Sequence, residues 1–376
     1  MADLSVPQSD PKAGYLAHKA EIDAAVARAL DSGWYILGRE VASFEAEFAG
    51  FVGVAHGIGV ASGTDALVLA LRALGIGPGD VVATVSHTAV ATVAAIELVG
   101  AVPLLIDVDP RRYTIDVDEL GVVLARQAPR IKAVVPVHLY GQPAPMAEIQ
   151  KLAERFGVAI IEDCSQAHGA MLGNSQVGRF GRIACYSLYP TKNLGALGDG
   201  GIVLTDDEAL AVRVRELREY GWRERYVSAT TGTNSRLDEL QAAILRVKLA
   251  HLAADNQRRR EIAGAYDGGL AGTGLGLPGS WLGTTPVYHQ YVVTTAARSR
   301  LRQALKERGI ATNIHYPVPV HRQPAYADRV PLGPAGCRQT ERLAEEILSL
   351  PMYPQLSQAQ IAHVVQSLGE AVRLVA

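Results

Sequence analysis

Cysteine is scarce in this chain of 376 residues. It has three cysteines, Cys164, Cys185 and Cys337, and no two of them form a C-x-x-C pair. Three cysteines cannot build a disulfide framework, and such a chain suits a reducing compartment. Cys164 and His168 lack a second ligand pair at a suitable spacing, so we expect no structural metal. We predict a cytoplasmic protein.

Export signals, membrane spans and an excess of one charge are also missing. The first ten residues are polar, with neither the basic segment nor the apolar core of a signal peptide. The longest stretch poor in charge, residues 81–96, is interrupted by polar residues and is shorter than the roughly 20 apolar residues of a bilayer span. Lys plus Arg number 36 and Asp plus Glu 38, a net charge of −2. We therefore expect neither a membrane nor a nucleic acid as partner.

Two familiar motifs are absent, and a third is a near match. The chain contains no G-x-S-x-G and no G-x-x-x-x-G-K-[ST] sequence. Residues 57–63 read G-x-G-x-x-x-G, one residue longer than the dinucleotide-binding fingerprint. A nicotinamide-dependent dehydrogenase therefore remains an alternative, to be tested by titration with NADH.

Apolar runs of strand length alternate with helical patterns. Most of the runs are continuous rather than alternating, which is typical of strands covered on both faces in a largely parallel sheet. The loop 190–200 has no room for a crossover helix, so the last two strands should be antiparallel. We predict an α/β fold with a mostly parallel seven-stranded sheet between helices. The strands are expected at 57–61, 81–85, 102–107, 131–137, 158–162, 184–188 and 201–205, and helices at 65–74, 89–99, 116–126 and 145–156.

The pattern changes in the last third of the chain. A helix is predicted from Ser235 to about Asp255, with Ser235 and Asp238 resembling a capping box. A glycine-rich connection then precedes a strand-like run at 288–294, a helix at 299–309 and two further helices. We predict a large α/β domain at 1–254 and a smaller α+β domain at 255–376.

Two charged residues follow predicted strands. Lys192 either extends along the surface to water or is a Schiff-base lysine whose pKa is lowered by burial. Asp163 either caps the next helix or faces a ligand at the carboxyl edge of the sheet. A lysine and an acid at such positions are the two groups that a pyridoxal 5'-phosphate (PLP) enzyme needs, one to hold the cofactor and one to pair with the pyridinium nitrogen.

A phosphate site could complete such a cofactor site. Gly63 and Thr64 lie where a predicted strand passes into a helix, and a helix N-terminus attracts anions. An ordinary helix cap is the alternative interpretation. The glycines after Lys192 are expected to let the backbone approach the cofactor, namely Gly195, Gly198, Gly200 and Gly201.

Seven ordered segments carry a family resemblance. The most specific are IEDCSQAHGA at 161–170 and YSLYPTKNLGALGDGG at 186–201. The chain resembles the DegT/DnrJ/EryC1/StrS family of PLP-dependent nucleotide-sugar aminotransferases, which has the type I, aspartate aminotransferase-like fold. The other matching segments are 33–49, 60–75, 135–146, 233–245 and 314–326.

The resemblance implies roles around the cofactor. Lys192 matches the lysine that forms the imine and moves the proton, and Asp163 matches the acid at the pyridine nitrogen. Gln166 matches a residue near the ring hydroxyl, and Ser187 matches a member of the phosphate cup together with Gly63 and Thr64. Asn234 matches an asparagine that reaches the phosphate in the neighbouring subunit, which implies a homodimer with shared sites.

The resemblance also implies a reaction. Lys192 stands where some relatives carry a histidine and perform dehydration, so this chain looks like a true aminotransferase. His87 falls where the family has a ring over the cofactor face, and its context is similar to that of the subgroup acting at carbon 3 of a 3-keto-6-deoxyhexose; carbon 4 is the alternative. We expect glutamate as amino donor, pyridoxamine phosphate as the intermediate cofactor form, and a nucleotide-linked keto sugar as acceptor. A catalytically silent regulatory member is the remaining alternative. Substrate contacts are expected at Tyr35, Arg236, His315 and Tyr316.

Overall fold

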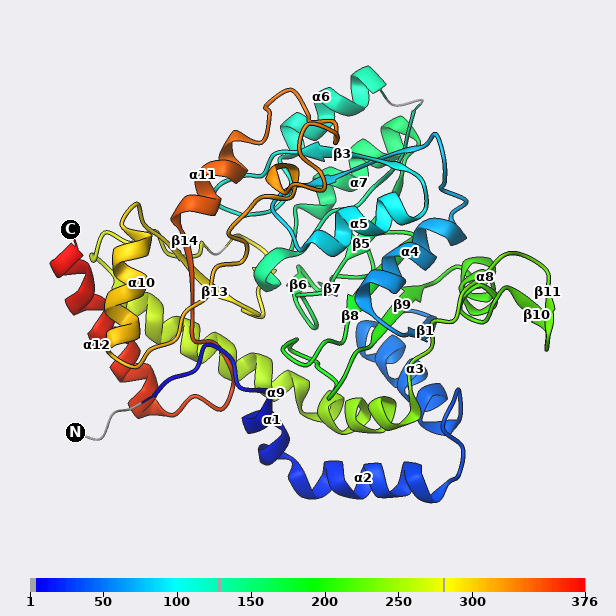
Figure 1. Ribbon diagram of the computed structural model, residues 1–376, viewed down its shortest axis with the longest axis horizontal. Coiled ribbons are helices and arrows are strands. Elements are labelled where there is room, and N and C mark those ends of the chain that lie inside the picture. The colour runs from blue at the N-terminus through cyan, green and yellow to red at the C-terminus, as the bar shows by residue number, and fades with distance from the viewer. Residues whose placement is uncertain (1–4, 128–129, 280, 376) are drawn as a thin grey trace.

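A seven-stranded sheet forms the centre of the molecule. The computed structural model describes residues 5–127, 130–279 and 281–375 (Figure 1); the first four residues, part of the start expected to lack a signal peptide, lie outside it. The strand order is β1-β9-β8-β5-β4-β2-β3. Each strand overlaps one of the predicted runs, so the predicted sheet is confirmed. The strands are β1 (His56–Val60), β2 (Val81–Val85), β3 (Val102–Ile106), β4 (Ile131–Val134), β5 (Ala159–Asp163), β8 (Ile183–Ser187) and β9 (Gly201–Thr205).

The antiparallel direction of β9 brings the carboxyl ends of its two neighbouring strands to the same edge of the sheet. The pairs β3–β2, β2–β4, β4–β5 and β5–β8 are parallel, whereas β9 is antiparallel to both β8 and β1. The predicted antiparallel pair is therefore confirmed. Gly201 opens β9 opposite both Ser187 and Val60, so the carboxyl ends of β8 and β1 lie at the same edge.

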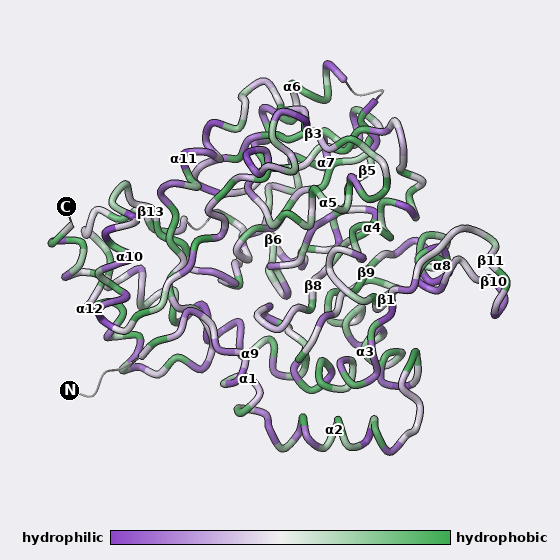
Figure 2. The backbone as a smooth tube through the Cα atoms, in the orientation of Figure 1, coloured by the Kyte–Doolittle hydropathy of each residue, from purple (hydrophilic) through white to green (hydrophobic). Residues whose placement is uncertain are grey.

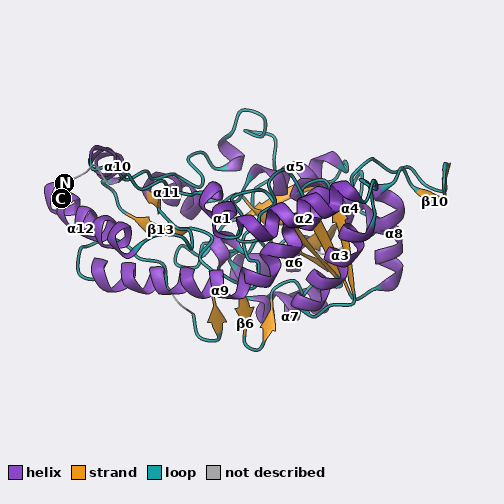
Figure 3. Ribbon diagram, turned by 90° about the horizontal axis from the view of Figure 1, so that it is seen from below, coloured by secondary structure: helices purple, strands orange, loops and turns teal. Residues whose placement is uncertain are grey.

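Helices cover both faces of the sheet (Figure 3). One face packs on α4 (Gly63–Ala73), α5 (Val90–Leu98) and α8 (Glu208–Arg218). The opposite face packs on α3 (Arg39–Val52), α6 (Val117–Gln127), α7 (Met146–Phe156) and the first half of α9 (Glu239–Leu270). Because both faces are buried, the strands need apolar residues at nearly every position. The hydrophobic colour in Figure 2 accordingly gathers around these strands.

Helix α9 is longer than predicted and begins later. It runs for 32 residues from Glu239, and the capping-box interpretation is wrong because Asp238 makes no side-chain cap bond. The Ser235 hydroxyl instead donates to Asp65 in α4 at 2.8 Å. The predicted end near Asp255 is also wrong, because the helix continues to Leu270. Gly269 lies inside it, where an added Cβ would collide with Val365 of α12 (Gln358–Val375). The glycine therefore allows two helices to approach closely.

The C-terminal elements surround the second half of α9. Strands β13 (Tyr291–Thr294) and β14 (Ile347–Leu350) form an antiparallel pair that packs with α10 (Arg298–Glu307) and α12. Their shared core includes Tyr266 of α9. Helix α11 (Arg338–Glu346) instead packs on the core of the large sheet through Leu343. The domain division at residues 254 and 255 stays a prediction, and that position falls within α9. The smaller elements are α1 (Pro11–Ala17), α2 (Lys19–Asp31), β6 (Met171–Leu172), β7 (Ser175–Gln176), β10 (Trp222–Glu224), β11 (Val227–Ser228), β12 (Thr284–Thr285), η1 (Leu139–Gly141) and η2 (Val320–Arg322).

Among the described residues, none of the helices combines the length and the apolar character that a membrane crossing requires. The two longest helices, α9 and α12, instead bury one side of their surface in the C-terminal core.

Glu239 fixes the start of α3 from the start of α9. Its buried carboxylate accepts hydrogen bonds from the backbone N–H groups of Gly38, Glu40 and Val41 at 2.8–2.9 Å. Removing it leaves those donors unpaired, so Glu239→Ala should lower the free energy of unfolding by about 3 kcal/mol. Denaturant unfolding checks this, with the exposed Glu307→Ala as matched control. Equal midpoints for the two variants would contradict the role given to Glu239.

Candidate active site

A cavity of about 320 Å³ opens at the carboxyl edge of the sheet. Loops that follow β1, β2, β5 and β8 line one side, and segments from the last third of the chain line the other. This is the edge where ligands bind in open α/β sheets. Eight of the predicted site residues lie in its wall: Gly63, Thr64, Asp163, Gln166, Ser187, Lys192, His315 and Tyr316.

Asp163 ends β5 and is held by two hydrogen bonds. Thr92 Oγ1 donates to its Oδ2 at 2.8 Å, and the Ser165 backbone N–H donates to its Oδ1 at 3.1 Å. Asp163 is 4% exposed and lines the cavity. Thr92 was missed by the sequence analysis, although a threonine inside the apolar helix 89–99 was a usable signal.

The neighbouring acid, Glu162, has a structural role. Its buried carboxylate accepts backbone N–H bonds from Gly178, Phe180 and Gly181 at 2.7–2.8 Å, and its Oε2 lies 3.1 Å from His138 Nε2. Side chains alternate across a strand, so consecutive acids point to opposite faces. Glu162 therefore organises the loop before β8, while Asp163 is left facing the cavity.

Lys192 lies in the loop after β8 and lines the cavity. Burial lowers the pKa of its amine from 10.5 to about 8, and the negative charge of Asp163 opposes that shift. A lysine with such a pKa has a sizeable fraction of neutral, nucleophilic amine near neutral pH. Of the two interpretations of Lys192, the geometry favours a reactive lysine over one that extends along the surface.

The N-terminus of α4 packs directly against the end of β8. Ser62 caps the helix by accepting from the Asp65 backbone N–H, and a Cβ on Gly63 would lie 2.6 Å from the Cβ of Ser187. Glycine is therefore required for the helix end to reach Ser187. The N-terminal amides of an 11-residue helix and the hydroxyls of Thr64 and Ser187 together suit a phosphate.

The glycines after Lys192 make room for the protein itself in most cases. A Cβ on Gly195 would lie 2.5 Å from the carbonyl oxygen of Pro190, and one on Gly198 would lie 2.9 Å from Gln241. One on Gly201 would collide with the carbonyl oxygen of Ser62. Packing against the protein accounts for these three glycines, and none of them is among the residues that line the cavity, so their expected approach to a cofactor stays a prediction. Gly200 does line the cavity.

Gln166 links three parts of the cavity wall. Its Oε1 accepts from the Tyr140 backbone N–H at 2.7 Å, and its Nε2 donates to the Tyr316 hydroxyl at 3.1 Å. The Tyr140 hydroxyl bonds the His315 carbonyl and lies 2.9 Å from His87 Nε2. His87 is buried behind this wall and is not among the residues that line the cavity.

Three predicted residues lie away from this cavity. Tyr35 is 51% exposed, and its hydroxyl donates to the Leu30 carbonyl. Asn234 is exposed and Arg236 is half-buried, on the segment just before α9. In the described part of a single chain, the residues that line the cavity do not include Tyr35, Asn234 or Arg236.

The fold and the cavity together define the class. A mostly parallel seven-stranded sheet, with a lysine and an aspartate at its carboxyl edge, is the arrangement of the type I aminotransferase fold. The sequence model of the DegT/DnrJ/EryC1/StrS aminotransferase family matches residues 17–369, and the chain belongs to this family. The family and the fold class predicted from the sequence are both confirmed.

Known relatives extend over nearly the whole chain. A dTDP-3-amino-3,4,6-trideoxy-alpha-D-glucose transaminase from Streptomyces venezuelae is 49% identical over 97% of this chain and 96% of its own length. A UDP-N-acetyl-3-dehydro-alpha-D-glucosamine 3-aminotransferase from Acidithiobacillus ferrooxidans is 46% identical over 96% of each chain. The crystal structure of S. venezuelae DesV with a ketimine intermediate has a TM-score of 0.94 at 48% identity, covering 98% of both chains.

Proposed function

We propose that this protein is a PLP-dependent aminotransferase that transfers an amino group from glutamate to carbon 3 of a nucleotide-linked 3-keto-6-deoxyhexose. The proposal rests on the composition of the cavity wall, where Lys192 and Asp163 lie beside a helix N-terminus suited to phosphate. The 49% identity to a dTDP-3-amino sugar transaminase supports carbon 3. A dTDP-3-amino-3,6-dideoxy-alpha-D-galactopyranose transaminase from Aneurinibacillus thermoaerophilus, 42% identical, supports the same position.

The residues of the cavity fit the cofactor. Lys192 would hold its aldehyde carbon, Asp163 would pair with the ring nitrogen, and Ser187, Gly63 and Thr64 would hold the phosphate. The solved structure of NtdA from Bacillus subtilis contains the bound cofactor PMP. That protein is 27% identical to this chain, and the two structures superpose with a TM-score of 0.89. When bound, PLP supplies an electron sink for the carbon that loses a proton.

The chain's own groups would then manage charge and protons. The Lys192 amine, with a pKa of about 8, is suited to take a proton from one carbon and return it to another at neutral pH. Asp163 stays beside the ring nitrogen because Thr92 and Ser165 fix both of its oxygens. His315 is held neutral because burial lowers its pKa to about 4, so it would meet the substrate as an uncharged partner.

We further propose a cytoplasmic homodimer. Asn234, Arg236 and Tyr35 do not reach the cavity of their own chain, which suits a role in the neighbouring subunit's site. The buried, unpaired state of all three cysteines suits a reducing compartment. Mixing inactive Lys192→Ala chains with inactive Asn234→Ala chains should restore part of the activity, because one site in the mixed dimer has both residues intact. Absence of any recovery in a verified mixed dimer would contradict shared sites.

The dehydrogenase alternative loses its sequence support. A Cβ on Gly57 would lie 2.5 Å from the Glu45 carbonyl oxygen, and one on Gly59 would lie 2.9 Å from Leu237. Packing against α3 and the segment just before α9 therefore accounts for these glycines without a dinucleotide. Some relatives carry regulatory names, such as the pleiotropic regulatory protein of Geobacillus stearothermophilus at 41% identity. The complete set of Lys192, Asp163, Gln166 and Ser187 in the cavity wall supports a catalyst over a protein that only binds.

A substrate panel tests the proposal. Purified protein should convert nucleotide-linked 3-keto sugars with glutamate to 3-amino sugars, identified by product mass and NMR. A 4-keto sugar with the same nucleotide is the matched control and should react far more slowly. Preferred amination at carbon 4 would overturn the assignment of position, and turnover with NADH but not with PLP would overturn the class of reaction.

A further inference from the structure

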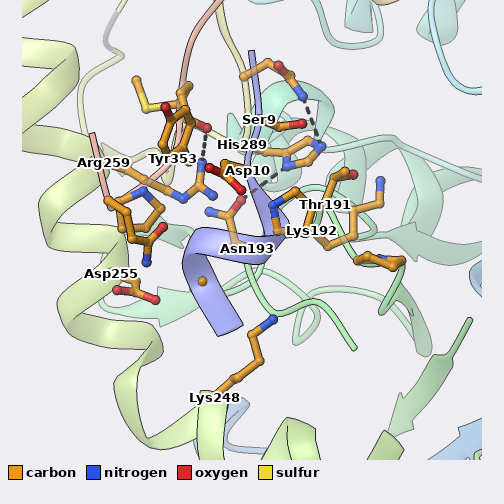
Figure 4. A pocket seen from close by; sticks show the side chains of 17 residues that line it. Ser9, Asp10, Thr191, Lys192, Asn193, Lys248, Asp255, Arg259, His289 and Tyr353 are labelled. Carbon is orange, nitrogen blue, oxygen red and sulfur yellow. Dashed lines mark hydrogen bonds between the residues drawn. The ribbon is translucent and has the colours of Figure 1, made fainter. Parts of the chain in front are cut away.

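His289 separates the active-site cavity from a second, smaller cavity. The smaller one, about 50 Å³, lies behind the Lys192 loop, between α9 and the segment that follows β14 (Figure 4). Lys192, His289 and Gln290 line both cavities. His289 is 5% exposed, and none of the sequence motifs pointed to it. Its position raises the question of what its imidazole presents to Lys192.

One side of the His289 ring is engaged by Asn193, the residue after Lys192. His289 Nδ1 lies 3.2 Å from Asn193 Oδ1, and the two side chains face each other in Figure 4. Asn193 Nδ2 donates to Asn256 Oδ1 and to the Val287 carbonyl oxygen, both at 2.9 Å. Asn256 Nδ2 in turn donates to the His168 carbonyl at 2.8 Å, in the loop after Asp163.

This network fixes the tautomer of His289. The Val287 carbonyl can only accept, so the nitrogen of the Asn193 amide must be the atom that faces it. The Asn193 oxygen then faces His289 and can only accept, so His289 Nδ1 must carry a hydrogen. In the neutral ring the other nitrogen, Nε2, therefore presents a lone pair.

The lone pair on Nε2 has only a weak partner among the described residues. Gln290 Nε2 lies 3.5 Å away, at the outer limit of a hydrogen bond, while the Oε1 of the same amide accepts from Gln8 at 2.6 Å. A buried acceptor in this state favours a better donor. The Lys192 amine is such a donor, carried by the residue next to Asn193.

We propose that His289 is a positioning residue whose Nε2 accepts a hydrogen bond from the Lys192 amine when the lysine side chain turns toward the wall shared by the two cavities. In the described structure both side chains line that wall and no hydrogen bond joins them. Asn193 orients the ring, and the ring orients the amine toward the reacting carbon. This inference rests on the proposed function, because it assigns His289 to the lysine of that reaction. It adds a residue that acts through Lys192 without any covalent step of its own.

The surroundings keep His289 neutral, as the role requires. Burial lowers its pKa well below the usual value, and the positive charge of Lys192 acts in the same direction. The other titratable or charged groups that interact with Lys192 or His289 are Asp163, His168, Arg259 and His315. A neutral acceptor beside Lys192 stabilises the ammonium form, so the hydrogen bond should raise the pKa of the lysine.

Two substitutions separate the nitrogens of His289. The amide nitrogen of Asn approximates Nδ1, so His289→Asn keeps the bond to Asn193 and removes the acceptor at the ε position. The amide of Gln reaches the ε position, so His289→Gln keeps an acceptor there and loses the donor to Asn193. His363→Asn, a distant histidine bonded to the Arg308 carbonyl, is the matched control.

The readout is the pH dependence of Lys192 modification in the full-length, cofactor-free protein. Trinitrobenzenesulfonate labels free amines, and peptide mass spectrometry reports Lys192 separately from Lys248, whose pKa is also lowered to about 8 by burial. His289→Asn should move the Lys192 midpoint to lower pH, with about tenfold faster labelling on the acid side if one hydrogen bond to an ammonium is lost. His289→Gln and His363→Asn should leave that midpoint near wild type, and Lys248 should not change in any variant.

Other patterns overturn the proposal. An unchanged Lys192 midpoint in His289→Asn would show that His289 makes no hydrogen bond to the Lys192 amine. Equal shifts of the Lys192 midpoint in the Asn and Gln variants would mean that the shift comes from the lost packing of the imidazole ring. A shift of the Lys248 midpoint would mean the same. Because no substrate is used, these outcomes are independent of whether carbon 3 is the position of amination.

A measurement on wild-type protein covers the case in which the variants do not fold. The ¹⁵N spectrum of histidine-labelled protein should show one histidine as the neutral Nδ1–H tautomer from pH 6 to 9, with its Nε2 signal moving when PLP binds and occupies Lys192. His289 is the described histidine whose Nδ1 faces an asparagine oxygen. If every histidine assigned to a buried site is cationic or carries its hydrogen on Nε2, the proposal fails.

Discussion

Lys192→Ala should abolish turnover, with a loss of about four orders of magnitude or more. The residue supplies both the covalent attachment of the cofactor and the proton transfer, and acid–base catalysis by one group alone contributes roughly 10²–10⁴-fold. Alanine leaves neither function in the cavity. Single-turnover kinetics with glutamate measure the loss, and the visible absorbance of bound PLP should change because the cofactor is no longer attached.

Lys248→Met is the matched control for this experiment. Lys248 also has a pKa lowered to about 8 by burial, but it lies on α9 and its amine bonds the Gly195 carbonyl. It lines the smaller cavity and not the active-site cavity. Its loss should affect stability and leave most of the activity. If both lysine variants lose the same activity, or Lys192→Ala keeps wild-type turnover, the assignment of Lys192 is wrong.

The strands of the sheet were predictable because of their burial. Residues 201–205 and 81–85 are buried at every position, so both are mostly apolar runs that lack the alternation of a half-exposed strand. The antiparallel turn of β9 followed from the length of the loop after Ser187 alone. Runs of two or three residues, such as β6 and β7, give no such signal, and their pairing depends on contacts that the sequence does not reveal.

The length of α9 could not be predicted from local propensity. Glycines at 264, 268 and 269 resemble the end of a helix, because glycine costs about 1 kcal/mol in a helix interior. Tertiary packing offsets that cost: Tyr266 and Leu270 are buried in the C-terminal core, and Gly269 admits Val365. Such contacts join residues about a hundred positions apart, beyond any pattern of periodicity.

The site residues also fall into two groups, those that the local sequence could identify and those that depend on distant contacts. Asp163 and Lys192 were recognisable because each ends or follows a strand, and motifs surround both of them. Thr92 and His289 were missed because their importance arises from partners that fold against them, namely Asp163 and Asn193. The resemblance to a family supplied Asn234 and Arg236, which are not among the residues that line the cavity of their own chain.

The second large effect is expected for Asp163→Asn, whose turnover should fall by about 10²–10³-fold with cofactor still bound. Asparagine is nearly the same size. Its oxygen can still accept from the Ser165 backbone N–H, and its NH2 group can donate to the Thr92 hydroxyl, which is able to accept, so the cavity should keep its shape. It lacks the negative charge that stabilises a protonated ring nitrogen, and electrostatic stabilisation of this kind accounts for several kcal/mol in active sites. The rate of the half-reaction with glutamate and the affinity for PLP measure the two effects separately.

Glu162→Gln makes the comparison decisive, because it removes one charge from the adjacent residue of the same strand. Its carboxylate accepts three backbone N–H bonds and faces His138, so its loss should lower the melting temperature and leave the half-reaction close to wild type. Two adjacent buried acids would then divide cleanly into one for stability and one for chemistry. A normal rate for Asp163→Asn, or an equal loss of rate in both variants, would contradict this assignment. Strand β5 would then have only a structural role, and the reaction would not depend on the charge of Asp163.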